Sequence, residues 1–311
     1  AGLPERFGII LGTGEEVLFR VDDFINYYRR VRDSFLELQN GFTGDFADRP
    51  EPLARVNHGR WMSHADAYLD ERDHLVRVAG ISVGQIRKLN AAGIDRLEQL
   101  AIANGVAVKK MAEPTLKKLT AQAKLQHETR QDRLANPDAL PRFEVLNATG
   151  PNGEPLGLAA LPAAHSADVF FDMEGYPLML GGLEYLFGAS TINSKTGEIE
   201  FQDWWAHDRD QEKSALEGFV DWVFARWQAN PGMHIYHYAA YEVSAVRRLS
   251  TRHDTRQDEV DQLLRNKVFV DLYQIVRQGL LIGEDSYSIK SVERLYRPNR
   301  KTEVATATDS I

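Results

Sequence analysis

The chain has 311 residues, of which 43% are hydrophobic and 26% are charged, a composition typical of a soluble globular protein. This length predicts two domains, or two and part of a third. The formal net charge of -8 supplies no overall attraction to nucleic acid, although an acidic metal site would itself contribute negative charge. The absence of cysteine excludes disulfides, thiolate zinc sites and cysteine-ligated iron–sulfur clusters. There is no long apolar run and no signal peptide, so we expect a cytoplasmic protein that does not enter a membrane.

Neither end of the sequence has the features of a natural terminus. The first residue is Ala1 rather than Met, and a strand–turn–strand pattern begins almost at once. The last stretch, KTEVATATDSI, is polar and completes no helix or strand. We therefore expect the chain to be part of a longer protein.

The first part of the chain combines a hairpin with helices. Residues 7–21 have the pattern of a hairpin around a Gly-Thr-Gly turn, and residues 21–38 repeat apolar side chains at helical spacing. Residues 40–52 have the composition of a linker. Residues 114–135 predict a long basic helix, which we interpret as a spacer between domains.

Short helices separated by Ala-Gly-Ile turns are predicted between residues 74 and 101. This pattern is typical of a helix-hairpin-helix, in which a glycine turn and the following helix N-terminus offer backbone N–H groups to a phosphate. The residues that would make this contact with nucleic acid are Gly80, Arg87, Lys88 and Gly93. A small helical unit that only packs against its neighbours explains the same pattern equally well.

From residue 167 onward, runs typical of strands alternate with runs typical of helices. Three strands in a meander are followed by helix, strand, helix and strand, which is the element order of the ribonuclease-H-like fold. The predicted fold class is therefore α/β, with a mixed sheet flanked by helices and preceded by the helical region. The first strand of this fold is central, so we expect Phe170 and Phe171 to be buried. Asp172 would then lie at the carboxyl end of that strand, where open α/β sheets form their sites.

Two carboxylates, Asp172 and Glu174, follow the apolar run VFF at the end of this predicted strand. Side chains two residues apart on a strand share a face, so these carboxylates would lie side by side, opposite Phe171 and Met173. Neighbouring carboxylates repel each other unless something positive lies between them, and a divalent cation with oxygen ligands is the obvious candidate. Two solvent-facing acids at a strand end would give the same pattern.

Two further acids are expected near the same edge of the sheet. Glu242 begins the helix after the fourth strand, which neighbours the first, and Asp271 ends the fifth strand. Taken alone, Glu242 suits a helix N-terminus and Asp271 suits a helix cap. Taken with Asp172 and Glu174, they indicate a two-metal site for phosphoryl transfer, with paired Mg²⁺ or Mn²⁺. His237 either lines this site beside Glu242 or is a satisfied sheet histidine.

Several stretches of the chain resemble a family of RecB-like nucleases. The stretches that carry the resemblance are DVFFDMEGYP, GGLEYLFGA, WWAHDRDQEK, MHIYHYAAYE, VFVDLYQIVR and SYSIKSVERLY. Members of this family join a RecB-type nuclease, a helical hairpin region and a ribonuclease-H-like exonuclease domain, sometimes followed by a helicase. The resemblance covers nearly the whole chain. It implies that residues 1–50 are the end of the RecB-type nuclease, 51–140 the helical region and 141–311 the ribonuclease-H-like domain.

The ribonuclease-H-like part resembles DEDD-type 3′→5′ exonucleases. Asp172 and Glu174 match the first motif of these enzymes, and Glu242 in HYAAYE takes the place of their usual aspartate. Asp271 matches an acid of the family whose role is either catalytic or structural. The last carboxylate of the family, in a Tyr-Asn-x-x-Asp motif, is expected beyond Ile311. The chain as given would then lack one metal ligand and could be inactive on its own.

The stretch PLARVNHGRWMSHAD resembles a segment that carries cysteines in relatives. Val56, Gly59 and Ala65 occupy those positions in this chain, so no iron–sulfur cluster is expected.

The leading hypothesis is a metal-dependent 3′→5′ exonuclease on single-stranded DNA or RNA, with Mg²⁺ or Mn²⁺ bound by Asp172, Glu174 and Glu242. The alternative is a catalytically degenerate nucleic-acid-binding module attached to a helicase or a second nuclease. A nucleotide-processing hydrolase on the same fold is a third interpretation. Four aromatic residues could either stack on bases or pack in the core: Tyr185, Trp204, Trp205 and Tyr238.

Overall fold

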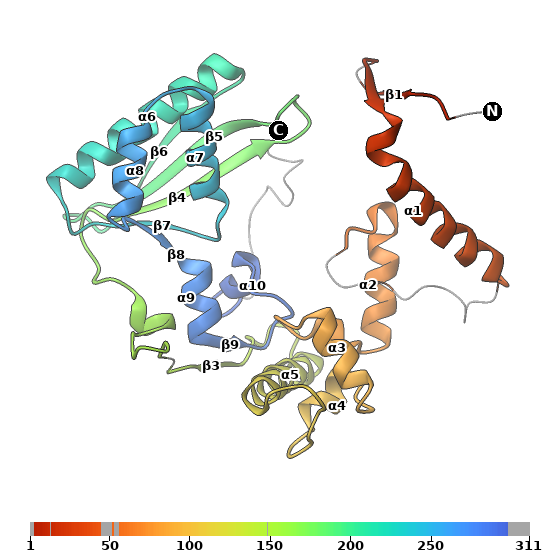
Figure 1. The fold of residues 1–311 in the computed structure, drawn as a ribbon. Helices are drawn as coiled ribbons and strands as arrows, with labels where there is room; N and C mark the ends of the chain where they lie inside the picture. Colours follow the sequence, from red (N-terminus) through yellow and green to blue (C-terminus); the bar gives the residue numbers. More distant parts are fainter. Residues whose placement is uncertain (1–2, 13, 45–51, 53–55, 148, 298–311) are drawn as a thin grey trace. The chain divides into compact units, whose positions relative to one another are not determined.

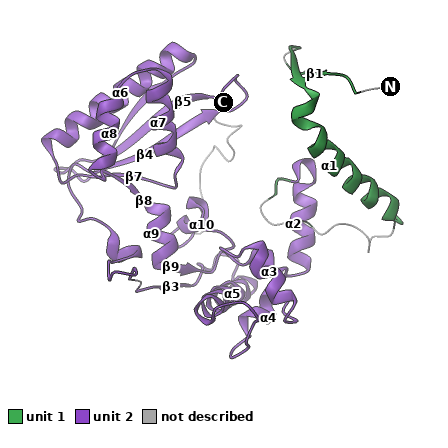
Figure 2. Ribbon diagram, viewed as in Figure 1, with its two compact units in different colours: residues 1–57 green, residues 58–311 purple. Residues whose placement is uncertain are grey.

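The computed structural model describes residues 3–12, 14–44, 52, 56–147 and 149–297. The chain forms two compact units, Ala1–Asn57 and His58–Ile311 (Figure 2). The domain boundaries expected at residues 50 and 140 stay predictions. More than half of the expected linker at 40–52 lies outside the described residues.

The first unit is a hairpin followed by a helix, as the sequence predicts. β1 (Arg6–Ile10) pairs antiparallel with β2 (Glu16–Arg20), and α1 (Val21–Gly41) follows directly. Val21 is the one buried residue of α1. Phe24 of this helix packs edge-on against Phe7 and Phe19 of the hairpin, while most of its apolar stripe is exposed.

The second unit begins with a small helical region. Its elements are the 3-10 turns η2 (Gly59–Trp61) and η3 (Leu75–Arg77) and the helices α2 (Met62–Glu71), α3 (Val83–Asn90), α4 (Leu97–Ala101) and α5 (Glu113–Ala135). Leu89, Leu97 and Leu100 are fully buried in its core. The predicted glycine turns are present, because Gly80 precedes α3 at φ 80° and Gly93 follows it at φ 79°. Glycine enters this backbone region without strain.

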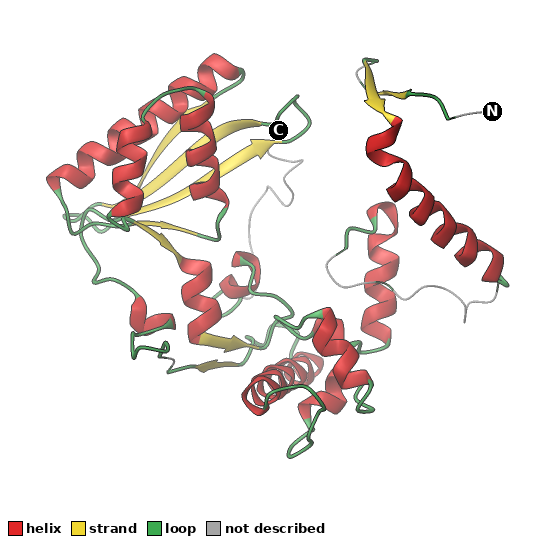
Figure 3. Cartoon of the chain, viewed as in Figure 1, coloured by secondary structure: helices red, strands yellow, loops and turns green. Residues whose placement is uncertain are grey.

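A five-stranded mixed sheet forms the centre of the ribonuclease-H-like part (Figure 3). Its strands are β4 (Val169–Tyr176), β5 (Leu183–Ile192), β6 (Ile199–Trp205), β7 (Ile235–His237) and β8 (Phe269–Asp271). Their order is β6-β5-β4-β7-β8, with β4 antiparallel to β5 and parallel to β7. The predicted meander and the central position of the first strand are confirmed.

Three helices cover one face of this sheet (Figure 1). They are α6 (Arg209–Ala229), α7 (Tyr241–Arg252) and α8 (Gln257–Arg265). Phe171 of β4 stacks on Phe219 of α6, with ring centroids 3.9 Å apart, at the centre of the resulting apolar core. None of the described helices has the length and apolar character needed to cross a lipid bilayer.

The opposite face of the sheet exposes several large apolar side chains. Phe170 is 43% exposed and stacks on Tyr236, with ring centroids 5.5 Å apart. The expectation that Phe170 is buried is therefore wrong, whereas Phe171 is buried as predicted. Successive side chains of β4 alternate between faces, and the helices of the core cover the Phe171 face. The other exposed apolar residues on the Phe170 face are Ile192, Ile199, Phe201 and Trp205.

A two-stranded ribbon and short helices complete the second unit. The ribbon pairs β3 (Phe143–Val145) antiparallel with β9 (Leu280–Ile282), and neither strand was predicted from the sequence. The short helices are η4 (Gly157–Ala160), α9 (Leu272–Gly279) and α10 (Ile289–Glu293). Gln122 of α5 donates a 2.6 Å hydrogen bond to the carbonyl of Ile282, so the ribbon is joined to the helical region.

Candidate functional site

Asp172 and Glu174 share one face of β4, as the sequence predicts. Phe171 and Met173 are buried beneath the helices, and the two acids are exposed on the other face. The register of β4 against β5 shifts between Glu174 and Gly175, which marks a β-bulge directly after the second acid. Such bulges redirect side chains and are common next to active sites.

Glu242 approaches the same region from the first turn of α7. This helix follows β7, which is the parallel neighbour of β4. Glu242 is only 4% exposed, and its Oε2 atom has no hydrogen-bond partner among the described residues. The Nδ1 atom of His237 lies 3.4 Å from this oxygen. A buried carboxylate oxygen without a full hydrogen bond is unfavourable, so it is available to a cation.

The pKa of Asp172 indicates that the three carboxylates interact. Desolvation raises the pKa of Asp172 from 3.8 to about 6, while the amide of Met173, which donates to Oδ1 at 3.0 Å, opposes the rise. The negative charges of Glu242 and Glu174 raise the pKa further. Three acids therefore gather at the carboxyl end of β4 without a compensating cation.

Asp271 has a different environment from these three acids. Its Oδ1 atom accepts hydrogen bonds from the amides of Tyr273 and Ala239, each at 2.9 Å. The first bond caps α9, and the second holds the turn before α7. Both bonds agree with the interpretation of Asp271 as a helix cap.

The turn held by Asp271 contains an unusual backbone conformation. Ala239 has φ 75°, a region that residues with a Cβ atom rarely enter. Its carbonyl oxygen lies 2.6 Å from Nδ1 of His237, and because a carbonyl can only accept, Nδ1 carries the proton. His237 is thus a satisfied sheet histidine that also neighbours Glu242. The turn fixed in this way determines where α7 begins and so where Glu242 lies.

The sequence did not identify the residues that hold α7 against β5. Glu184 of β5 accepts a 2.6 Å hydrogen bond from the hydroxyl of Tyr241 and forms an ion pair with Arg248. Gly175 leaves room for this contact, because a Cβ atom there would lie 2.4 Å from the Tyr241 oxygen and 2.5 Å from the Glu184 carboxylate. A glycine directly after the acidic pair was the one signal for this packing in the sequence.

The four residues expected to contact nucleic acid do not form a single group. Gly80 and Gly93 lie at opposite ends of α3, which is about 12 Å long for its eight residues. Lys88 donates to the carbonyl of Lys110 at 2.8 Å, and Arg87 is exposed on the same helix. Gly80 lines a cavity together with residues of α5 and α9.

The four aromatic residues divide between packing and exposure. Trp204 packs against the sheet core, and Tyr238 donates a 2.5 Å hydrogen bond to the carbonyl of Tyr287. Tyr185 and Trp205 line a cavity of about 290 Å³ near the end of β4. Of the four rings, these two therefore line a cavity, and Trp205 is exposed.

The chemistry of the three acids suits a hard divalent cation, because Mg²⁺ and Mn²⁺ prefer carboxylate oxygens. In the part of the chain that the structure describes, no three His, Asp or Glu side chains are arranged so that they could hold a metal ion. Asp172, Glu174 and Glu242 thus supply suitable donors and an uncompensated negative charge, without forming a complete set of ligands.

Comparison with known proteins agrees with this architecture. Residues 169–311 match the family model described as the RNase_H superfamily. No curated protein and no solved structure matches the chain. The matched residues include all five strands of the mixed sheet and the three acids beside β4. This part of the chain is therefore a ribonuclease-H-like domain.

Proposed function

We propose that this domain hydrolyses phosphodiester bonds in nucleic acid with divalent ions held by Asp172, Glu174 and Glu242. Bound Mg²⁺ or Mn²⁺ would activate water and stabilise the leaving oxygen. The observation that carries the proposal is the buried, unpartnered Oε2 of Glu242 in a group of acids that raises the pKa of Asp172. Clustered, repelling acids have no structural use that a neutral side chain would not serve better.

The surrounding residues would give the acids a fixed geometry. Asp172 and Glu174 project from a central strand, and Glu242 is positioned by the turn that Asp271 and His237 hold. The exposed sheet face beside them offers aromatic surface, such as that of Trp205, on which bases of a flexible strand would stack. We therefore favour a single-stranded DNA or RNA substrate and 3′→5′ exonuclease cleavage, in line with the resemblance to DEDD-type enzymes.

A nucleic-acid-binding module without catalytic activity is the second candidate. It is favoured by one observation, the absence of a complete three-ligand arrangement among the described residues. Such a module would guide a helicase or a second nuclease in a longer protein.

The test compares the wild-type chain with the Asp172→Asn and Glu242→Gln variants. Single strands labelled at either end are incubated with Mg²⁺ or Mn²⁺, and the products are resolved by length. We expect the wild type to remove nucleotides one by one from the 3′ end of the strand. Both variants should do so at least about 100-fold more slowly. The exposed acid Asp261 on α8 provides the matched control, because its replacement by Asn changes the same charge away from the site.

A second readout is independent of cleavage. Mn²⁺ at 100 times its dissociation constant should stabilise the wild-type chain by about 2.7 kcal/mol, seen as a rise in Tm. The Asp172→Asn variant should show little of this rise. If Mn²⁺ raises the Tm of both proteins equally, Asp172 binds no metal ion and the proposed metal site is wrong. If neither protein then cuts either label but both bind the strand, the binding-module alternative is favoured.

A further inference from the structure

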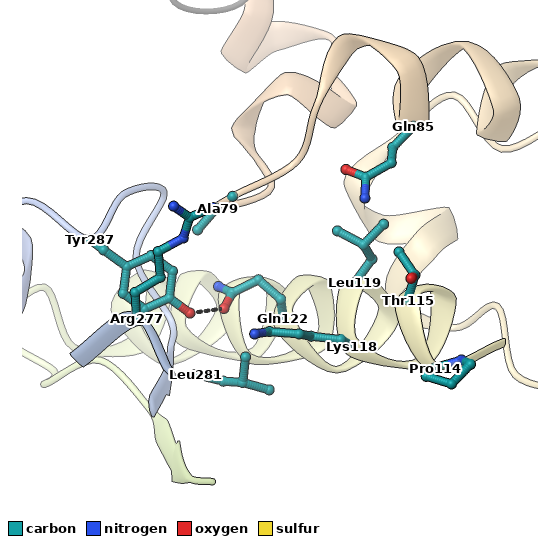
Figure 4. A pocket seen from close by; sticks show the side chains of 11 residues that line it. Ala79, Gln85, Pro114, Thr115, Lys118, Leu119, Gln122, Arg277, Leu281 and Tyr287 are labelled. Carbon is teal, nitrogen blue, oxygen red and sulfur yellow. Dashed lines mark hydrogen bonds between the residues drawn. The ribbon is translucent and has the colours of Figure 1, made fainter. Parts of the chain in front are cut away.

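A cavity separate from the carboxylates lies where the helical region meets the β3–β9 ribbon. Its volume is about 370 Å³, and its lining comes from the turn at Gly80, from α5 and from the segment around α9 and β9 (Figure 4). These segments are far apart in the sequence. The cavity therefore exists only in the folded second unit.

The charges around this cavity all have one sign. Lys118 of α5 and Arg277 of α9 are its charged lining residues, and none of the Asp and Glu residues that the structure describes lines it. Within the described residues, neither cation has a carboxylate at ion-pair distance, in contrast to Arg133, Arg209 and Arg248, which all pair with buried glutamates. The chain as a whole has a net charge of -8, so this positively charged site differs in sign from the protein around it.

The polar side-chain atoms at the floor of the cavity already have hydrogen-bond partners. Gln122 is buried, donates to the carbonyl of Ile282 at 2.6 Å and accepts from the hydroxyl of Tyr287 at 2.8 Å (Figure 4). The same hydroxyl lies 3.1 Å from the carbonyl of Leu280. A ligand would therefore be bound by the side chains at the rim rather than by the floor.

The rim offers hydrogen-bond donors in addition to the two cations. Gln85 forms a capping box with Ser82, in which its side-chain oxygen accepts from the Ser82 amide at 2.7 Å. This fixes the side-chain amide, whose nitrogen points toward Leu119 in Figure 4. Gly80 at φ 80° forms the turn beside it without a side chain that would narrow the opening.

We propose that this cavity binds a phosphate of a nucleic-acid strand, with Lys118, Arg277 and Gln85 as the donors. A site with two cations, further donors and no acid selects an anion, and guanidinium and ammonium groups suit phosphate oxygens. The choice of a strand over a small phosphate rests on the proposed function, because a nuclease that meets its substrate at the carboxylates gains affinity from a second backbone contact.

The test measures binding without cleavage. A fluorescently labelled single strand is titrated with the full chain in EDTA, and anisotropy gives the dissociation constant at several salt concentrations. We expect Lys118→Gln and Arg277→Gln each to weaken binding about tenfold. Each should also reduce the slope of log affinity against log salt by about 0.7.

Two control variants match these changes in charge. Lys117→Gln alters the next residue of α5, which lines a different cavity, and Arg265→Gln alters an arginine of α8 paired with Asp261. Both should bind within about twofold of the wild type. The Tm of every variant is measured, so that a loss of binding is not confused with unfolding.

The outcomes separate this proposal from the proposed nuclease activity. If Lys118→Gln and Arg277→Gln weaken binding while no protein cuts nucleic acid, the phosphate-binding proposal is supported and the proposed nuclease activity is not. If the two variants bind like the controls, the cavity proposal is wrong whatever the cleavage result. If inorganic phosphate raises the Tm of the wild type but strand binding is unchanged in the variants, the ligand is a small phosphate and the proposal is overturned.

Discussion

The buried Glu212 and the three acids Asp172, Glu174 and Glu242 of the ribonuclease-H-like domain differ in the number of cations around them. Glu212 is completely buried and is surrounded by Arg209 at 2.9 Å, His253 at 2.8 Å and Arg252 at 3.5 Å. Asp172, Glu174 and Glu242 form the second group. Of the basic residues, only His237 lies within ion-pair distance of that group among the described residues.

The pKa values move in opposite directions in the two groups. Burial alone would raise the pKa of Glu212, but the amide of Glu184, His253 and Arg209 together more than offset it, and the pKa is lowered. For Asp172, desolvation and neighbouring acids raise the pKa to about 6. Cations of the protein thus surround Glu212, whereas the proposed function assigns a divalent cation to the three acids beside β4. The difference separates a structural group from a candidate active site.

The largest expected effect on stability comes from removing the charge of Glu212. The Glu212→Gln variant leaves Arg209, Arg252 and His253 without their common partner, so we expect a loss of about 3 kcal/mol in the free energy of unfolding. Chemical denaturation of wild type and variant gives this value. Asp261→Asn, at an exposed pair on α8, should cost less than about 1 kcal/mol. Equal losses at the two sites would remove the distinction between the groups.

A second, smaller effect concerns the dependence of stability on pH. The folded pKa of Glu212 lies below its ordinary value of 4.5, so its contribution is complete above pH 4.5 and is lost as pH falls through the folded pKa. Its part of the slope is at most about 1.4 kcal/mol per pH unit. The free energy of unfolding, measured by urea denaturation between pH 3 and pH 6, should fall less steeply with decreasing pH in Glu212→Gln than in the wild type. An unchanged slope would mean that acids other than Glu212 determine the loss of stability at low pH.

The smallest effect should appear at Asp172 in the absence of metal. Its folded pKa of about 6 lies above the ordinary 3.8, so ionisation destabilises the fold as pH rises through this interval. Asp172→Asn in EDTA should therefore have a higher Tm than the wild type at pH 7.5 and the same Tm near pH 3.5. Because Asp172 is exposed to solvent, we expect a difference of only about 2 °C. A lower Tm at pH 7.5 would mean that Asp172 is a structural residue.

The sequence predicted the features that depend on local patterns. The five strands of the mixed sheet, their meander and the shared face of Asp172 and Glu174 follow from apolar alternation and turn residues. The exposure of Phe170 was missed, because a strand pattern shows which residues alternate but not whether both faces are covered.

Features that depend on distant partners were not predicted. Tyr241 and Arg248, which contact Glu184, lie 57 and 64 residues further along the chain, and Gly175 alone signals this packing in the sequence. The strands β3 and β9 have three residues each, too few for a periodic pattern. For Asp271, the sequence analysis left a catalytic and a capping role open, and the hydrogen bond from the Tyr273 amide agrees with the cap.

The pairing of β3 with β9 has a consequence for how the protein folds during synthesis. Phe143 leaves the ribosome before the mixed sheet, and its partner Ile282 leaves after all five strands of that sheet. The ribbon therefore closes a very long loop and must form late. Until it does, Gln122 of the newly made helical region lacks the carbonyl of Ile282. A chain that ends before β9 would thus leave the side chain of Gln122 without this acceptor.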